Sequence, residues 1–127
     1  MALKIPAVLV LAVLFITPHP ETKKMKMHNN VNAMKEEVLK RIPIGSSIEY
    51  AKAVMKKNGF KCEMMWNDSF AGEDDKGNRV TREGMDFLYC DKEKMAFPLI
   101  LRRWQIAIIH KNGVVSEVSV SIHLTGL

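Results

Sequence analysis

Hydrophobic and polar residues alternate most regularly near the end of the chain, between Arg102 and Leu124. In the second half of this region, four apolar residues alternate with polar ones: Val118, Val120, Ile122 and Leu124. A two-residue period is that of a β-strand with one dry face and one wet face. Asn112-Gly113 separates this segment from an apolar segment before it and is typical of a hairpin turn. The pattern therefore predicts a hairpin whose dry face needs a cover.

The length of the hairpin loop decides which residues face each other across the two strands. A two-residue turn would place Ile108 opposite Glu117, which divides the apolar residues between the two faces. We therefore expect a three-residue loop of Lys111, Asn112 and Gly113, with Gly113 in the left-handed conformation. This register pairs Trp104 with Val120 and Ile106 with Val118 on one face.

Two helices are predicted before the strands. Apolar residues recur at helical spacing over residues 32–41, and Pro43 ends this helix because the residue before a proline avoids helical geometry. Ser46 and Glu49 fit a capping box at the start of a second helix. Asn58-Gly59 fits the end of that helix.

The remaining segments complete a sheet. We expect strands over residues 60–66 and 85–90, separated by a long polar loop or irregular hairpin tip at 67–82. A second loop at 91–98 leads to the final hairpin. The order of elements predicts an α+β fold, in which two N-terminal helices pack on one face of a four-stranded antiparallel sheet.

The first segment differs in composition from the rest of the 127-residue chain. Lys4 precedes an unbroken apolar run over residues 7–16, and prolines follow it. This run is about half the ~20 residues of a membrane-spanning helix, but it fits the ~7–15 residues of a signal-peptide core. We predict a signal peptide at 1–20, a linker at 21–30 and a single domain at 31–127, in a periplasmic or secreted protein. An uncleaved signal that anchors the protein and a buried N-terminal helix are the alternatives.

Cys62 and Cys90 are the only two cysteines. In an exported chain an even number of cysteines favours a disulfide, whose loop closure should stabilise the fold by about 3–4 kcal/mol. The four histidines show no metal-ligand spacing, so we expect neither a metal nor another cofactor.

The formal net charge is +5, which is a mild excess of positive charge. Lysine runs of this kind are usually solvated faces, and we expect no nucleic-acid partner for an exported chain. Weak association with an anionic membrane surface fits the charge better.

Candidate binding residues gather between residues 64 and 75. Adaptable methionine beside tryptophan, as at Met64, Met65 and Trp66, is a composition found at contact surfaces. An acidic run follows, and it lacks the ligand spacing of a calcium-binding EF-hand loop. We predict that five residues contact a protein partner: Trp66, Phe70, Glu73, Asp74 and Asp75. The alternative is that alternate apolar members fill the core and that the acidic residues form a solvated loop tip.

The sequence offers no catalytic constellation. His110 lies at the turn end of the dry face and His123 on the wet face, so the two do not converge, and no Ser-His-Asp arrangement can be built. Pairing of the cysteines would remove the available thiol nucleophiles. We predict a protein without enzymatic activity; a hydrolase with an unrecognised site is the alternative.

Several short motifs resemble a known family. They are Gly45-Ser46-Ser47-Ile48-Glu49 at a helix start, Asn58-Gly59 at its end, Cys62, Cys90 and a closing pair of strands. Together they resemble one repeat of the β-lactamase-inhibitor-protein-like domains, and the helix-helix-sheet unit is similar to the small BamE (SmpA/OmlA) lipoproteins of the bacterial outer membrane. The resemblance covers residues 32–124. It implies an envelope protein that acts by binding another protein, or an enzyme inhibitor that uses the 67–82 loop.

Two features set this chain apart from the proteins it resembles. The inhibitors carry two tandem units, and this chain has room for one. The lipoproteins carry a lipidated cysteine after the signal, and this chain has no cysteine there.

Overall fold

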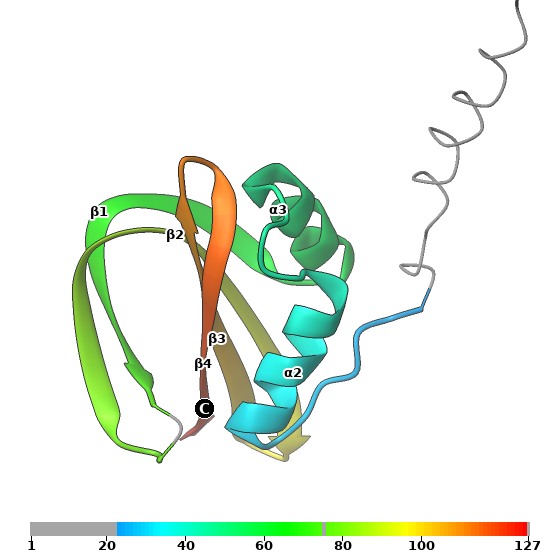
Figure 1. Ribbon diagram of the computed structural model, residues 1–127. Helices are drawn as coiled ribbons and strands as arrows, with labels where there is room; N and C mark the ends of the chain where they lie inside the picture. The colour runs from blue at the N-terminus through cyan, green and yellow to red at the C-terminus, as the bar shows by residue number, and fades with distance from the viewer. Residues whose placement is uncertain (1–22, 75, 127) are drawn as a thin grey trace, which may run out of the picture.

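Two helices and four strands make up the part of the chain that the computed structural model describes, residues 23–74 and 76–126 (Figure 1). The helices are α2 (Val31–Arg41) and α3 (Ile48–Lys57). The strands are β1 (Lys61–Glu73), β2 (Arg79–Phe97), β3 (Ile100–Lys111) and β4 (Val114–Gly126), and they form one antiparallel sheet in chain order. The α+β class and the four-stranded antiparallel sheet are confirmed. The predicted signal peptide at 1–20 lies outside the described residues.

The start of α3 differs from the prediction by one residue. Ser47, rather than Ser46, is the N-cap, and its hydroxyl accepts a hydrogen bond from the Tyr50 amide. The Ser46 hydroxyl instead donates to the Pro43 carbonyl. The cause is a tertiary contact: the Ser46 carbonyl accepts a hydrogen bond from the Val115 amide, and the extended Ser47 forms a β-bridge with Val114. The predicted capping box at Ser46 is therefore wrong, whereas the predicted stop at Asn58-Gly59 is confirmed.

The β3–β4 loop is shorter than predicted. Lys111 pairs with Val114, so the loop has two residues, Asn112 and Gly113, and both adopt positive φ angles. The predicted three-residue loop is wrong, although the left-handed conformation of Gly113 is confirmed. A bulge in β4 reconciles the short turn with the apolar pattern, because it leaves Ser116 without a partner between Val115 and Glu117.

The bulge changes the pairing of the apolar residues but keeps them together. Trp104 lies opposite Ile122 and Ile106 opposite Val120, so the predicted pairs are wrong by two residues. All four residues of the predicted face, including Val118, nonetheless belong to one buried cluster. The shared dry face is therefore confirmed.

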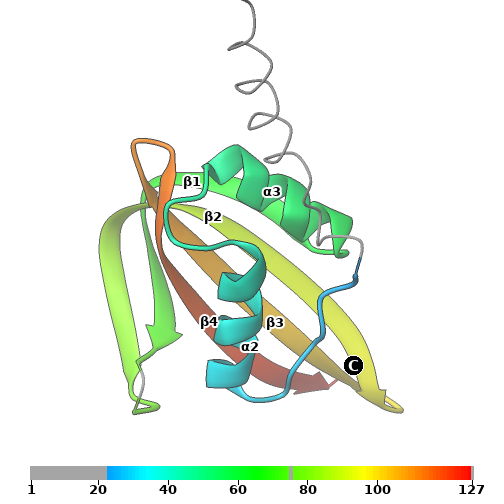
Figure 2. The ribbon, with the colours of Figure 1, turned by 45° about the vertical axis from the view of Figure 1, so that its right-hand side comes forward.

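The larger core of the fold draws on both helices and on three strands. Its buried residues include Met34, Val38, Ala51, Met55, Leu88, Trp104, Ile106, Ile108, Val118 and Val120. Figure 2 shows α2 and α3 lying in front of the strands. Burial of so many large side chains accounts for most of the hydrophobic stabilisation of the domain.

Residues 23–30, expected as a linker, have no helix or strand but are tied to the domain. Met25 is buried in the larger core, and its amide donates to the Asn58 side chain at 2.8 Å. The indole of Trp104 donates to the His28 carbonyl at 2.8 Å. The Arg41 guanidinium donates to the carbonyls of Lys23 and Lys24. This segment therefore acts as a strap along the helices and not as a free spacer.

The predicted loop at 91–98 is wrong, because β2 continues to Phe97. Of the two alternatives for residues 67–82, the irregular hairpin fits and the long loop does not, because β1 and β2 remain paired as far as Glu73 and Arg79. The turns that remain are short, at residues 74–78 and 98–99. These strand segments escaped prediction because their polar residues carry no apolar alternation, and backbone pairing alone forms the ladder.

The β1–β2 hairpin bends about halfway along its length. The β1–β2 register shifts on both sides of Asp68, and Asn67 and Gly84 lie side by side with positive φ angles. Such a bulged region bends and twists a pair of strands. The outer part of the hairpin, residues 68–83, is called the arm below; Figure 1 shows it in green, curving away from the helices.

The disulfide between Cys62 and Cys90 is confirmed. The two residues face each other directly across β1 and β2, with their Cα atoms 4.2 Å apart. The bond therefore joins the hairpin on the helix side of its bend. No helix in the described residues has the length and apolar character needed to span a bilayer.

Candidate functional site

The arm covers a second, smaller core on the face of the sheet opposite the larger one. Phe87, Ala107 and Ile109 are buried there, at alternate positions to the larger core along the same strands. From the arm, Phe70 packs edge-on against Phe87 with ring centroids 4.8 Å apart. This face of the sheet is therefore not open, because its own bent hairpin shields part of it.

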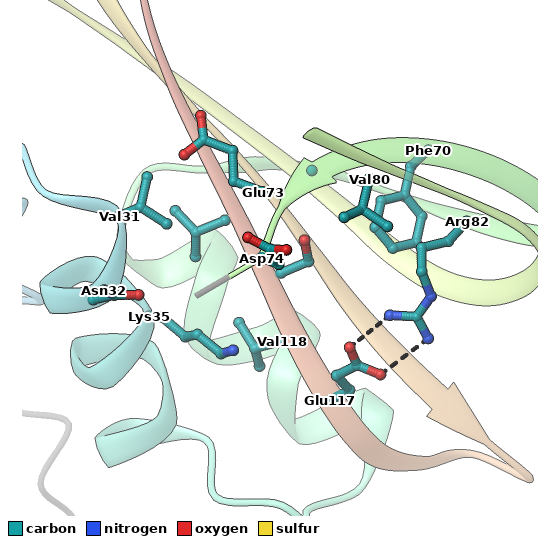
Figure 3. Close-up of a pocket in the computed structure, with 13 residues that line it drawn as sticks. Val31, Asn32, Lys35, Phe70, Glu73, Asp74, Val80, Arg82, Glu117 and Val118 are labelled. Atoms are coloured by element: carbon teal, nitrogen blue, oxygen red, sulfur yellow. Dashed lines mark hydrogen bonds and ion pairs between the residues drawn. The ribbon is translucent and has the colours of Figure 1, made fainter. Parts of the chain in front are cut away.

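A bidentate ion pair fastens the arm to β4. The Arg82 guanidinium donates to both carboxylate oxygens of Glu117, at 2.6 and 3.1 Å (Figure 3). These hydrogen bonds hold the pKa of Glu117 below its usual value, although burial raises it. The positive charges of Lys35 and Lys111 also lower the pKa. The geometry is that of a charge-assisted fork, the strongest common form of ion pair.

The arm also approaches β4 at Gly72. Gly72 lies so near Ser119 that a Cβ atom at position 72 would collide with the Ser119 hydroxyl. A side chain at position 72 would fit only if the Ser119 hydroxyl moved away, so glycine suits this position.

A pocket of about 240 Å³ lies where the arm, β4 and the start of α2 meet (Figure 3). Its lining includes Val31, Asn32, Lys35, Phe70, Gly72, Glu73, Asp74, Val80, Arg82, Glu117 and Val118. Both signs of charge and several apolar side chains are present. Such a lining can bind a peptide or a protein side chain through mixed polar and apolar contacts.

The predicted site residues fall into two places. Phe70, Glu73 and Asp74 line this pocket, and Asp75 lies outside the described residues. Trp66 lies apart from them at the base of the arm, where its side chain is 64% exposed. The structure thus brings three of the predicted residues together and leaves the tryptophan as a separate exposed surface.

Asp74 shapes the tip of the arm. Its carboxylate accepts hydrogen bonds from the amides of Asn78 and Lys76, both at 2.9 Å. The bond from the Asn78 amide is the main reason that the pKa of Asp74 lies below its usual value. The acidic run therefore contributes to turn structure as well as to surface charge.

Sequence reasoning missed Arg82, Glu117 and Lys35. The first two lie 35 positions apart and meet only because the arm bends, so no local pattern marks them. His110 was noted only as a dry-face residue. It is buried, neither of its ring nitrogens has a hydrogen-bond partner, and its ring makes an edge contact with Trp66 at 5.3 Å.

A second pocket, of about 280 Å³, lies on the arm side of the sheet and contains a serine-histidine pair. The hydroxyl of Ser121 and Nε2 of His123 are 2.8 Å apart. No aspartate or glutamate is among the described residues that line this pocket. A carboxylate that orients the imidazole, as in a catalytic triad, would have to come from outside this lining.

The described residues contain no group of three or more histidine, cysteine or acidic side chains placed to hold a metal ion. Comparison of the chain with protein-family models, with curated proteins and with solved structures found no match.

Proposed function

We propose that this chain is an exported, non-enzymatic protein that acts in the envelope by binding another protein through its arm. The apolar run after Lys4 and the disulfide between Cys62 and Cys90 support an oxidising compartment outside the cytosol. The resemblance to the inhibitor-like and BamE-like domains supports a binding role and does not suggest a catalysed reaction.

The proposed architecture assigns different tasks to the two faces of the sheet. We propose that α2 and α3 roof one face and give the domain its stability. The arm covers part of the other face and presents its outer side to a partner. Most residues of the arm tip are exposed, Glu73 and Asp74 among them.

The observation that carries the proposal is the preorganised arm with an exposed tryptophan at its base. The Arg82–Glu117 ion pair, the Phe70–Phe87 contact and the Asp74 turn hold the arm in one shape before any partner binds. Preorganisation reduces the ordering cost of association, and tryptophan is among the residues that most often dominate binding energy. The acidic tip favours a partner surface that carries basic residues.

A cross-linking pull-down from the envelope fraction tests this proposal. The full chain should recover one main partner, and Trp66→Ala should lower that recovery at least tenfold. Tyr50→Ala is the matched control, because Tyr50 is an exposed aromatic residue on α3, away from the arm. Equal recovery by the two variants, or no partner at all with the unmodified chain, would contradict the proposal.

Inhibition of an enzyme is the second candidate, and the rigid tip favours it. A short turn fixed by Asp74 can enter an enzyme cleft without a large loss of entropy. Under this candidate the purified protein lowers the activity of an envelope enzyme, and Asp74→Ala weakens the inhibition. If the activity of the partner were unchanged when the complex forms, inhibition would be contradicted and binding alone would remain as the proposed role.

A further inference from the structure

Large apolar side chains are exposed together at the end of the sheet where β2 turns into β3. Phe97 is 60% exposed and Leu99 is 69% exposed, and Met95 and Leu124 are also more than half exposed. Single exposed apolar residues are ordinary on soluble proteins, whereas a contiguous group indicates a contact site. Figure 2 shows this turn and the end of β4 at the same extremity of the sheet.

Leu99 is in a backbone conformation that does not favour leucine. Its φ angle is +65°, in the left-handed region where glycine is preferred, and it follows Pro98 in a two-residue turn. Glycine here would relieve the backbone strain and remove an exposed apolar side chain. A leucine that is unfavourable in both respects points to a use for the side chain outside the folded domain.

The apolar residues lie on both faces of the ribbon and not on one. Phe97 pairs with Ile100, and Met95 pairs with Leu101, and successive residues of β3 point to opposite faces. A flat protein surface would contact only one of these faces. An end that is apolar on all sides suits insertion into a surrounding apolar medium.

Positive charges flank the turn. Lys94 and Arg102 face each other directly across β2 and β3, and the sequence between them contains no acidic residue. Like charges opposite one another are unfavourable in an isolated sheet. Both side chains line a pocket of about 210 Å³ with Met27, Asn29, Met95, Ala96 and Trp104, a set without a carboxylate.

We propose that the β2–β3 turn is a membrane wedge that enters the surface of an anionic phospholipid bilayer. Leu99 and Phe97 reach the boundary of the acyl chains, and Lys94 and Arg102 bind headgroup phosphates at the neck of the wedge. Apolar burial combined with cations at headgroup level is the general basis of interfacial binding. This surface is separate from the arm, so the wedge and the protein partner can be tested independently.

Vesicle co-sedimentation of the full chain tests the wedge. Vesicles of phosphatidylcholine with about one quarter phosphatidylglycerol are compared with vesicles of phosphatidylcholine alone. Leu99→Gly should lower the partition of the protein onto anionic vesicles about tenfold, from the lost burial of one leucine. The variant should fold at least as well as the original, since glycine fits the turn. Val114→Ser, at an exposed apolar position beside the β3–β4 turn, is the control and should bind normally.

The cations are tested by Lys94→Gln and Arg102→Gln. Each should lower partition onto the anionic vesicles about fivefold and leave binding to phosphatidylcholine alone unchanged. Equal partition of Leu99→Gly and the original chain would overturn the wedge, and so would equal binding of the original chain to both kinds of vesicle. Concentration-dependent dimers that form without vesicles and disappear in Leu99→Gly, with no vesicle preference, would assign the turn to contact between two copies instead.

Discussion

Each face of the sheet contains a buried core, but the two cores are formed by different means. The larger core is one cluster of side chains from β2, β3 and β4, from both helices and from the strap at residues 23–30. The smaller core is covered by the arm, which is part of the same sheet. The larger core contains many large buried side chains, whereas the smaller core has three buried residues beneath a bent hairpin that an aromatic contact and an ion pair help to hold.

This difference indicates that the two cores respond differently to a lost side chain. A packed layer of helices cannot move into a cavity without losing other contacts, while a bent hairpin can shift toward the sheet. The larger core should therefore set the stability of the domain, and the smaller core should set the position of the arm.

The largest effect is expected from matched truncations in the two cores. Ile106→Ala should lower the free energy of unfolding by about 4 kcal/mol, and Ile109→Ala by only about 2 kcal/mol, because the arm can close over the smaller cavity. Both residues are isoleucines that are fully buried on β3, so the two variants lose the same atoms from the same strand. Urea denaturation followed by circular dichroism measures the difference. Equal losses would show that the arm is as rigid as the helical cover.

The disulfide should have the next largest effect. Replacing both Cys62 and Cys90 by alanine should lower stability by about 3–4 kcal/mol, since the bond closes a loop of 28 residues in the unfolded chain. The same loss should appear when the original protein is unfolded in the presence of a reductant. If the reduced protein were as stable as the oxidised one, the disulfide would not contribute to stability.

Acid should weaken the strap through Glu37. Burial raises the pKa of this carboxyl, but hydrogen bonds from the Lys26 amide, Arg41 and His28 outweigh burial and hold the pKa below its usual 4.5. A lowered pKa in the folded state stabilises the fold above pH 4.5, and this stability is lost as the pH falls further. Glu37→Gln should lower the free energy of unfolding by about 1–2 kcal/mol at neutral pH. The difference between the variant and the original protein should become smaller in acid.

Denaturation at neutral pH and near pH 3.5 measures the Glu37 effect. Glu36→Gln serves as the control, because Glu36 is the exposed neighbour on the same helix. A penalty for Glu37→Gln that stays constant with pH would mean that the ionised carboxylate is not the stabilising form.

The smallest effect on global stability is expected at the ion pair of the arm. The side chains of Arg82 and Glu117 are a third or more exposed, so Glu117→Gln should cost only about 0.5–1 kcal/mol. Amide hydrogen exchange in residues 68–83 should nevertheless become faster, while exchange in α2 stays the same. Glu83→Gln, at an exposed position of the arm, is the control. Unchanged exchange in the arm would show that the ion pair does not hold it.

Prediction from sequence succeeded where a local pattern reports the final environment. The alternation around Ile106 and Val120 identified the dry face, and the two cysteines identified the disulfide. The strand over residues 91–97 was missed and residues 67–82 were left open between a loop and a hairpin tip, because the polar residues of both segments form a ladder through backbone groups that side-chain patterns do not mark.

The candidate site was predictable only in part for the same reason. Phe70, Glu73 and Asp74 were found from composition, and they do share a pocket. Arg82, Glu117 and Lys35 complete that pocket through contacts between distant parts of the chain. The one-residue error at Ser46 also has a tertiary cause, its pairing with Val115.

The close approach of Gly72 to Ser119 also bears on aggregation. An antiparallel sheet normally has two free edges, each of which can recruit a strand from another molecule and start a fibril. Here the bend brings the outer half of β1 beside the edge of β4, so part of each edge is obstructed within the same molecule. The arm therefore leaves less free edge on which a strand of another copy could pair.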